Sequence, residues 1–557
     1  MEAVIAYIGQ TARQTLSGNA RALWMPELPE TLYLDELRAG EERGEGEIRL
    51  CLGLCDDPEC QMQYPLYYDP AKEGNLFLAG GSATGKSTLL QTLLWQLCGD
   101  YSPQQVRILL AGADHAGVGC FEAMPHCLGI MRGKEEAECF FYHLEKLFEA
   151  RREMLKGISF WQYRKHNGPE SVLFLVIDGY GGFREMTQDA YQSLIEHLAG
   201  EGINYGIYLI LTASGAGGGD IPGKLFEKMK TSLAFEMSDR FQYGDILRRY
   251  QTSVWPKENV KGRGLCRISE RILEFQVPLV APGDDYQRIE RIEELVKRWD
   301  GACPDIRRER FPVVPAKPCY HSMLRDFAGQ ETAEGDLPIG YEEISGYIKT
   351  VSLKEGDTFL ISGAPQTGKR NLLLCMMEGI WKLGGRTALI DRKRMLGARA
   401  LEAASIQGQE ERLTVISDGA SFASWYCGRK DRQEGWYLCL CDLADFTGML
   451  CGYEEEIREA GKELEQRLEQ GRLFPVIALQ CPGKETEAFG TPLFEQFVKC
   501  QCGVHLGGNV DNQRMLAMDD LGYTQMSRAL APGNGFYKSG PYGRTERIRI
   551  PLYDDIS

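Results

Sequence analysis

The sequence predicts an α/β fold made of two similar domains, each with a parallel sheet covered by helices. Three observations support this prediction. Apolar, strand-like runs alternate with helical patterns in both halves of the chain. A glycine-rich loop follows a strand-like run in each half, at residues 80–88 and 363–371. Each half closes with two strand-like runs around a polar turn, at 262–279 and 533–552, which predicts a terminal β-hairpin.

The individual elements repeat in the same order. In the first half the strand LFLA (76–79) precedes the loop, and further strands are expected at 172–178 and 205–214. Helices are expected at 87–97 and 135–155, where apolar residues recur near the helical period. In the second half KEGDTFLISGAPQTGK (354–369) repeats the strand and loop, and strands are expected at 436–442 and 473–480. Self-similarity at this long period indicates duplicated domains.

A charged helical stretch (284–301) and a proline-rich segment (311–318) separate the two halves. The first 50 residues lack a complete strand and helix pattern and are interpreted as a lead-in from an upstream region. The predicted division is therefore a lead-in at 1–50, a first domain at 51–300, a linker at 301–335 and a second domain at 336–557.

Composition narrows the functional class. The chain has 557 residues, of which 43% are hydrophobic and 25% charged, as in an ordinary globular protein. No apolar run approaches the roughly 18 residues that cross a bilayer, and no signal-peptide pattern is present, so the chain is expected to be soluble. The net charge is −16 and no long basic run occurs, which argues against a nucleic-acid partner.

The 18 cysteines are scattered and never form a CxxC pair. Metal-ligand spacing is absent, and Cys439 and Cys441 are expected to be small core residues in an apolar run. Many unpaired thiols are typical of a reducing compartment.

The first glycine-rich loop, GGSATGKST, fits the P-loop pattern in full. Its backbone N–H groups and the following helix N-terminus are expected to bind the phosphates of ATP, with Lys86 reaching the β and γ oxygens and Ser87 holding Mg²⁺. The predicted nucleotide-binding residues are Gly80, Gly81, Ser82, Ala83, Thr84, Gly85, Lys86, Ser87 and Thr88.

Two further residues are expected at the first P-loop. Asp178 ends a buried strand, where a carboxylate can bind the magnesium, so Ser87 and Asp178 form the predicted metal site and Lys86, Asp178 and Thr212 the predicted catalytic set. Thr212 ends the next strand and is either a polar sensor of the γ-phosphate or a hydroxyl that caps the strand end. Gly179 stands where active ATPases of this type usually have glutamate.

The second P-loop is degenerate. Arg370 and Asn371 replace the Ser/Thr pair, and a guanidinium cannot ligate a metal. The metal carboxylate is ambiguous, because either Asp442 or Cys441 can take that position. This domain is expected to bind nucleotide weakly or not at all and not to hydrolyse it. The residues that retain the pattern, and that are candidates for phosphate binding, are Gly363, Gly368 and Lys369.

The order of these motifs resembles the FtsK/SpoIIIE-type ATPases of type VII secretion, the EssC/EccC proteins, with RecA/FtsK-like domains. The likeness covers most of the chain and includes RALWMPELPETLYLDEL (21–37), SPQQVRILL (102–110), EGINYGIYLILTAS (201–214) and GVHLGGNVDNQ (503–513). It implies that the chain holds the second and third ATPase domains of a longer protein.

The resemblance also implies cofactors, partners and location. ATP and Mg²⁺ are the implied cofactors. Secreted WXG100-class proteins, recognised through a C-terminal signal, are the implied partners, together with upstream domains of the same protein. The implied assembly is a hexamer at the cytoplasmic face of the cell membrane.

Three functional hypotheses follow. The first is an ATP-binding segment of a secretion motor, the second a nucleotide-gated receptor without turnover, and the third a DNA translocase of the same superfamily. Gly179 leaves open whether the first domain hydrolyses ATP without the full assembly. Candidates for an arginine finger are Arg240, Arg248 and Arg263.

Overall fold

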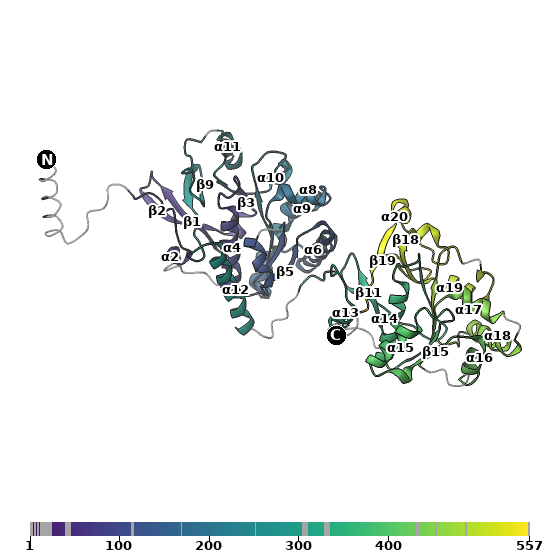
Figure 1. Cartoon of the computed structure of the whole chain (residues 1–557). Helices are drawn as coiled ribbons and strands as arrows, with labels where there is room; N and C mark the ends of the chain where they lie inside the picture. The colour runs from purple at the N-terminus through teal and green to yellow at the C-terminus, as the bar shows by residue number, and fades with distance from the viewer. Residues whose placement is uncertain are drawn as a thin grey trace. The chain divides into compact units, whose positions relative to one another are not determined.

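The computed structural model of the chain divides into two compact units, Met1–Phe311 and Pro312–Ser557 (Figure 1). Each unit contains a ten-stranded sheet, and the two sheets have the same strand order. The structure describes residues 25–38, 46–112, 116–168, 170–250, 252–302, 310–327, 335–429, 435–451, 454–484 and 487–554, together with Val4, Tyr7 and Thr11.

The first sheet combines parallel and antiparallel strands. In spatial order the strands are β2, β1, β10, β9, β8, β3, β7, β6, β4 and β5. The last six are parallel and the first four pair antiparallel. The strand bounds are β1 Leu50–Asp57, β2 Met62–Tyr68, β3 Leu76–Ala79, β4 Val106–Ala111, β5 Cys127–Met131, β6 Val172–Ile177, β7 Ile207–Ala213, β8 Thr231–Phe235, β9 Arg263–Ile268 and β10 Arg271–Gln276.

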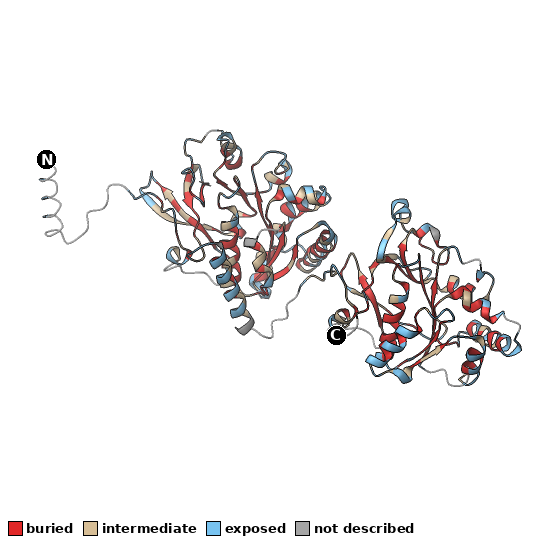
Figure 2. Cartoon of the chain, viewed as in Figure 1, coloured by how far each residue is buried: buried red, intermediate tan, exposed pale blue. Residues whose placement is uncertain are grey.

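Helices cover both faces of this sheet. Residues of α4 and α12 belong to one buried cluster, and residues of α6, α8 and α9 to the other. Figure 2 shows the buried strands between these helical layers. The helix bounds are α2 Leu34–Leu37, α3 Pro70–Glu73, α4 Lys86–Asp100, α5 Ala116–Gly119, α6 Lys134–Leu155, α7 Phe160–Asn167, α8 Tyr180–Thr187, α9 Gln192–Glu201, α10 Gly223–Glu227, α11 Phe241–Leu247 and α12 Asp285–Ala302.

The second sheet repeats the first strand for strand, in the order β12, β11, β20, β19, β18, β13, β17, β16, β14 and β15. Again six strands are parallel and four antiparallel. The strand bounds are β11 Leu337–Glu342, β12 Ile348–Val351, β13 Thr358–Gly363, β14 Arg386–Ile390, β15 Leu413–Ile416, β16 Trp436–Leu440, β17 Val476–Gln480, β18 Cys502–Gly508, β19 Leu530–Ser539 and β20 Thr545–Arg549.

In the second unit α14 and α15 pack on one face of the sheet, and α16 to α19 pack on the other. The two-domain α/β fold with helix-covered sheets and closing hairpins is therefore confirmed, with a parallel half that holds the P-loop. The helix bounds are α13 Tyr320–Phe327, α14 Lys369–Lys382, α15 Gly397–Ile406, α16 Gly419–Cys427, α17 Leu443–Leu450, α18 Glu455–Glu469, α19 Pro492–Cys500 and α20 Tyr523–Ser527.

The closing hairpins touch the P-loops in the same way. The amide of Gly262, just before β9, donates to Thr84 O at 2.8 Å, and the amide of Gly533 in β19 donates to Thr367 O at 3.0 Å. Each hairpin therefore supports the phosphate loop of its own unit, which gives a structural role to the glycine that opens both closing sequences.

Part of the expected lead-in belongs to the first unit. Leu28, Leu32 and Leu34 are buried. The amide of Leu34 donates to Leu279 O at 3.0 Å, and the amide of Leu279 donates to Leu32 O at 2.8 Å. Residues 25–38 thus pack beside the end of the first hairpin. The chain before residue 25, except for three single residues, lies outside the described part.

The segment expected to be a linker is partly structured. Phe311 packs against Phe140 and His143, and its amide donates to Leu128 O at 2.6 Å. Tyr320, the first residue of α13, is buried within the second unit, and its hydroxyl donates to Cys375 O. Residues 303–309 and 328–334 lie outside the described part. Within the described residues, no helix is both long and apolar enough to cross a bilayer.

Candidate functional site

The first P-loop connects β3 to α4 at the carboxyl end of the parallel strands, where open α/β sheets bind ligands. Gly85 adopts a φ of +113°, and Ala83 also has a positive φ. The ammonium of Lys86 donates to Gly80 O and Gly81 O, both at 2.6 Å. Burial lowers the pKa of Lys86, and the nearby carboxylate of Asp178 opposes this shift.

Four polar groups meet next to Lys86. Ser87 Oγ lies 3.4 Å from Asp178 Oδ2, and Thr212 Oγ1 donates to Asp178 Oδ1 at 2.7 Å. The amide of Gly179 in turn donates to Thr212 Oγ1 at 2.7 Å. Thr212 therefore fixes both the carboxylate and the turn that follows β6, and its hydroxyl is completely buried.

This arrangement fits a magnesium ion. A hydroxyl from the first turn of α4 and a carboxylate from the end of β6 converge, and hard oxygen ligands of this kind are the ones that Mg²⁺ prefers. The remaining predicted residues also lie at the loop. A hollow of about 460 Å³ is lined in part by Gly81, Ser82, Ala83 and Thr84. Thr88 lies in the first turn of α4 and its carbonyl accepts from Thr92 Oγ1.

The second P-loop has nearly the same geometry. Gly368 adopts a φ of +105° and Gln366, at the position of Ala83, also has a positive φ. The ammonium of Lys369 donates to Gly363 O at 2.5 Å and to Ala364 O at 2.6 Å. Burial lowers the pKa of Lys369, and the neighbouring Cys481 opposes this shift.

The sheet register decides which residue replaces the metal carboxylate. The amide of Asp178 donates to Ala111 O at 3.1 Å, and the amide of Cys441 donates to Ile390 O at 3.1 Å. Because Ala111 and Ile390 end matching strands, Cys441 occupies the position of Asp178. Of the two alignments that the sequence left open, the structure selects the one in which cysteine replaces the metal ligand.

Asp442 has a different role. Its side chain accepts the amide of Asp445 and so caps the N-terminus of α17. It also forms an ion pair with Lys393 at 2.9 Å. Cys441 is buried, and burial raises the pKa of its thiol, so it is neutral at physiological pH. Cys439 is buried too, which confirms the prediction of core cysteines.

The threonine beside the carboxylate is also replaced. Thr212 pairs with Leu78, two residues before Gly80, whereas Leu479 pairs with Ile361, two residues before Gly363. Leu479 therefore stands in the position of Thr212. The second unit lacks the hydroxyl, the carboxylate and the threonine of the first site.

Arg370 and Asn371 take the positions of Ser87 and Thr88. Arg370 is exposed, and its guanidinium donates to Met395 O at 3.4 Å. Asn371 donates to Pro551 O at 2.7 Å and accepts from the amide of Tyr553 at 2.8 Å. Asn371 therefore fastens the C-terminal segment to the P-loop helix.

The arginine-finger candidates differ in exposure. Arg263 is 2% exposed and bonds to Gln276 and to Leu28 O inside its own unit, so it cannot reach another molecule and this candidate was wrong. Arg248 donates to two carbonyls, of Phe226 and Met229, at 2.7 Å. Arg240 lies on the surface, paired with Glu258 at 3.2 Å and stacked over Trp255.

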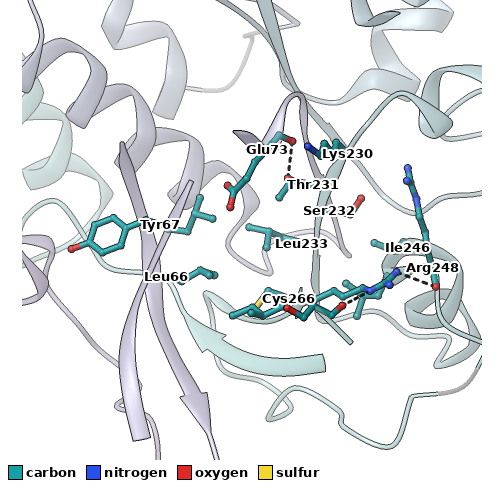
Figure 3. Close-up of a pocket in the computed structure, with 15 residues that line it drawn as sticks. Leu66, Tyr67, Glu73, Lys230, Thr231, Ser232, Leu233, Ile246, Arg248 and Cys266 are labelled. Carbon is teal, nitrogen blue, oxygen red and sulfur yellow. Dashed lines mark hydrogen bonds between the residues drawn. The ribbon is translucent and has the colours of Figure 1, made fainter. Parts of the chain in front are cut away.

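A separate hollow of about 410 Å³ lies on the first unit, away from the P-loop. Leu66, Leu233 and Cys266 contribute apolar surface, and Lys230 and Arg248 lie at its margin (Figure 3). It includes Thr231 at the start of β8, whereas the P-loop lies at the other end of that strand. This hollow is therefore not part of the nucleotide site.

Sequence reasoning missed a row of buried polar residues beneath the second P-loop. Ser362 pairs in register with both Gln480 and His505, on adjacent strands. In the first unit the same three positions are alanines, Ala79, Ala213 and Ala234. The signal in the sequence was a polar residue near the end of two apolar runs, Ser362 and Gln480, and one within a third, His505. The described residues contain no cluster of His, Cys, Asp and Glu that could hold a metal.

Comparison with known proteins agrees with this geometry. Residues 49–179, which include the first P-loop and Asp178, match the FtsK/SpoIIIE family. The ESX secretion system protein EccC of Geobacillus thermodenitrificans is 24% identical over 388 residues, covering 68% of this chain and 25% of that protein. The type VII secretion system protein EssC of Staphylococcus aureus (strain MRSA252) is 25% identical over 477 residues, covering 82% of this chain and 32% of that protein.

Solved structures show the same fold. ATPases 2 and 3 of EssC from Geobacillus thermodenitrificans superpose with a TM-score of 0.75 at 20% identity, covering 95% of this chain and 100% of that one. ATPases 2 and 3 of Thermomonospora curvata EccC, in complex with a signal sequence peptide, superpose with a TM-score of 0.55 at 20% identity, covering 96% and 100%.

Fold and site together define a tandem pair of P-loop NTPase domains, a class that binds nucleotides, usually with Mg²⁺. Within that class, the chain is related in sequence to the EssC and EccC proteins of type VII secretion and shares the fold of their ATPase domains 2 and 3. It spans about a quarter to a third of the length of these relatives.

Proposed function

We propose that this chain is the ATP-binding segment of a type VII secretion ATPase and that the first unit binds ATP with Mg²⁺. The observation that carries this proposal is the convergence of Lys86, Ser87 and Asp178 at an intact P-loop. In this proposal the N–H groups of residues 80–88 bind the phosphates. The ammonium of Lys86 exchanges its hydrogen bonds to Gly80 O and Gly81 O for bonds to the β- and γ-phosphate oxygens. Ser87 and Asp178 then ligate the metal.

The first unit acts mainly as a nucleotide-gated element, with slow turnover or none in the isolated chain. Gly179 follows Asp178, so no acidic side chain stands at the position that orients the attacking water. Thr212 is held between Asp178 and the Gly179 amide, so it can respond to a metal-bound γ-phosphate. Binding without rapid hydrolysis suits a receptor whose state is set by nucleotide.

The proposed partners are secreted proteins of the WXG100 class, recognised through a C-terminal signal, and upstream domains of the same protein. The relationship to EssC and EccC supports this assignment, since one related structure holds a signal sequence peptide. The proposed setting is a hexamer at the cytoplasmic face of the membrane. Calorimetry with a WXG100 protein, intact and lacking its C-terminal residues, tests the partner: only the intact form is expected to bind.

Titration with Mg-ATP, followed by calorimetry, tests the first site. The Lys86→Ala variant is expected to lose at least tenfold in affinity, because a buried charge-assisted contact to phosphate contributes roughly 1.5–3 kcal/mol. Lys146→Ala is the matched control, because Lys146 is exposed on α6, where it contacts Glu149 and the ring of Tyr142, away from the P-loop. Equal affinity in wild type and Lys86→Ala would refute the site. Phosphate release that Lys86→Ala abolishes would favour a motor over a receptor.

A further inference from the structure

We propose that the second P-loop is a metal-independent binding site for a diphosphate-bearing anion. The site comprises the loop amides of residues 363–369, Lys369, Arg370 and the buried His505. This inference goes beyond the proposed function, which rests on the first unit alone.

The second P-loop has the backbone conformation that binds a phosphate. Lys369 contacts the first two carbonyls of its loop as Lys86 does, and Thr367 Oγ1 donates to Ala364 O at 2.8 Å where Thr84 donates to Gly81 O at 2.9 Å. In each unit the closing hairpin supports the loop through the same hydrogen bond from a glycine amide. The second loop therefore keeps the lysine and threonine contacts of the first although the metal ligands are lost.

When neither site holds a metal, the second site carries more positive charge than the first. In the first site Lys86 and Asp178 cancel, and a bound divalent cation supplies two positive charges. In the second site Cys441 is neutral, and the buried carboxylate of Asp391 lies beside it. Lys369 and Arg370 supply two positive charges against this one negative charge, which leaves one net positive charge without a metal. Asp442, the nearest carboxylate in sequence, is paired with Lys393.

Arg370 lies where its charge can replace that of the metal. Its charge acts on both neighbouring groups: burial lowers the pKa of Lys369 and Arg370 adds to this shift, whereas burial raises the pKa of Cys441 and Arg370 opposes that shift. Arg370 holds the sequence position of the metal hydroxyl of Ser87, and Cys441 that of the metal carboxylate, so a guanidinium replaces one of the two metal ligands. A guanidinium donates to phosphate oxygens in a fixed fork, which suits a diphosphate.

His505 provides independent evidence for a ligand. Its ring is fully buried and lines a cavity of about 280 Å³ with Ala364 and Pro365 of the loop. Nδ1 lies 3.3 Å from Ser362 Oγ. Among the described residues Nε2 makes no hydrogen bond of normal geometry, and the backbone of Gly507 and Asn509 lies near the ring. When the Ser362 hydroxyl donates to Nδ1, Nε2 carries the ring proton and is a donor for an anion.

A bound anion would explain why a donor is buried at this position. A buried polar atom without a partner costs roughly 1–3 kcal/mol, and the alanine at the corresponding position of the first unit avoids that cost. Burial lowers the pKa of His505 to about 4, so the ring is neutral and donates without adding a charge. A ligand oxygen in the cavity would satisfy Nε2.

The test uses the whole chain with the first site disabled by Lys86→Ala. Calorimetric titration with ADP, and separately with inorganic pyrophosphate, is carried out in excess EDTA and in Mg²⁺. We expect binding of both probes with affinities equal within about twofold in the two buffers. Binding of ADP alone would show that the nucleoside is also required, and the anion site would still stand. Absence of binding in EDTA would refute this inference and leave the first site untouched.

Substitutions in the Lys86→Ala background locate the site. Arg370→Ser is expected to weaken binding in EDTA about tenfold or more, since a charge-assisted bond is lost. Arg370 is exposed, so this variant is expected to fold, and a melting curve equal to that of the parent checks this. His505→Ala, which restores the residue of the first unit, is expected to weaken binding several-fold. Unchanged affinity in both variants would refute the site.

A gain of metal dependence is the sharpest result. Arg370→Ser combined with Cys441→Asp rebuilds the hydroxyl and carboxylate of the first site in the second. This double substitution is expected to make ADP binding at least about tenfold tighter in Mg²⁺ than in EDTA. Binding that remains equal in the two buffers would show that Arg370 does not stand in for the metal.

Discussion

Gly85 of the P-loop lies directly against Gly262 at the start of the closing hairpin. A Cβ atom on Gly85 would be 2.6 Å from the amide nitrogen of Gly262 and 2.7 Å from its Cα. The hairpin therefore limits which residue the loop can have at this point, and the contact connects the last strands of the unit to its nucleotide site.

Replacement of Gly85 by alanine is expected to destabilise the first unit by at least about 2 kcal/mol, because left-handed backbone alone costs roughly 1–2 kcal/mol and the Cβ also meets backbone. Gly368→Ala is the matched control, since its Cβ meets the end of the Ile550 side chain at 3.0 Å, which can move. Thermal unfolding measures both. A larger loss in Gly368→Ala than in Gly85→Ala would contradict this account.

Replacement of Asp178 by asparagine is expected to remove the dependence of nucleotide affinity on Mg²⁺, because the amide keeps the shape of the carboxylate but loses its charge. The affinity of the first site in EDTA is expected to change less than in Mg²⁺. Titration with ATP in both buffers measures this difference. Asp442→Asn is the control, since Asp442 caps α17 and pairs with Lys393, and it is expected to leave the effect of Mg²⁺ intact.

Thr212→Val is expected to destabilise the first unit by about 1–3 kcal/mol, because the Gly179 amide loses its acceptor and Asp178 loses a donor in a buried place. The side-chain volume is nearly unchanged, so cavity effects are small. Chemical denaturation measures the loss. Thr187→Val is a useful control, since its buried hydroxyl bonds only to carbonyls of its own helix, and a smaller loss is expected there.

The C-terminal segment of the second unit is expected to be held more weakly at low pH. Burial raises the pKa of Asp554, but hydrogen bonds from Cys319 and His321 outweigh this and lower it to about 2. Since the unfolded pKa is about 3.9, the stabilisation is complete above about pH 4 and is lost as the pH falls through 2.

Asp554→Asn tests this contact. The side chain is 40% exposed, so solvent reduces the expected loss at pH 7 to about 1 kcal/mol. Hydrogen exchange of α13, followed by mass spectrometry, measures the loss locally. The difference between variant and wild type is expected to shrink as the pH falls towards 2. A difference that stays constant from pH 7 to pH 2 would mean that the carboxylate charge is not responsible.

The sequence by itself determined the duplication, the two P-loops and the closing hairpins. These features are visible in short stretches of sequence. A glycine-rich loop with its lysine, as at Gly85 and Lys86, and the spacing of apolar residues each extend over only a few positions. It also determined that Arg370 cannot ligate a metal, because that follows from the side chain alone.

Only the tertiary structure decided which residues of distant strands share a position. The register of hydrogen bonds between strands places Cys441 where Asp178 stands and Leu479 where Thr212 stands, and it joins Ser362 to His505. It also encloses Arg263 within its own unit. The sequence pattern predicts each strand but not the register in which it pairs with its neighbours. Register depends on contacts between segments that lie far apart in the chain.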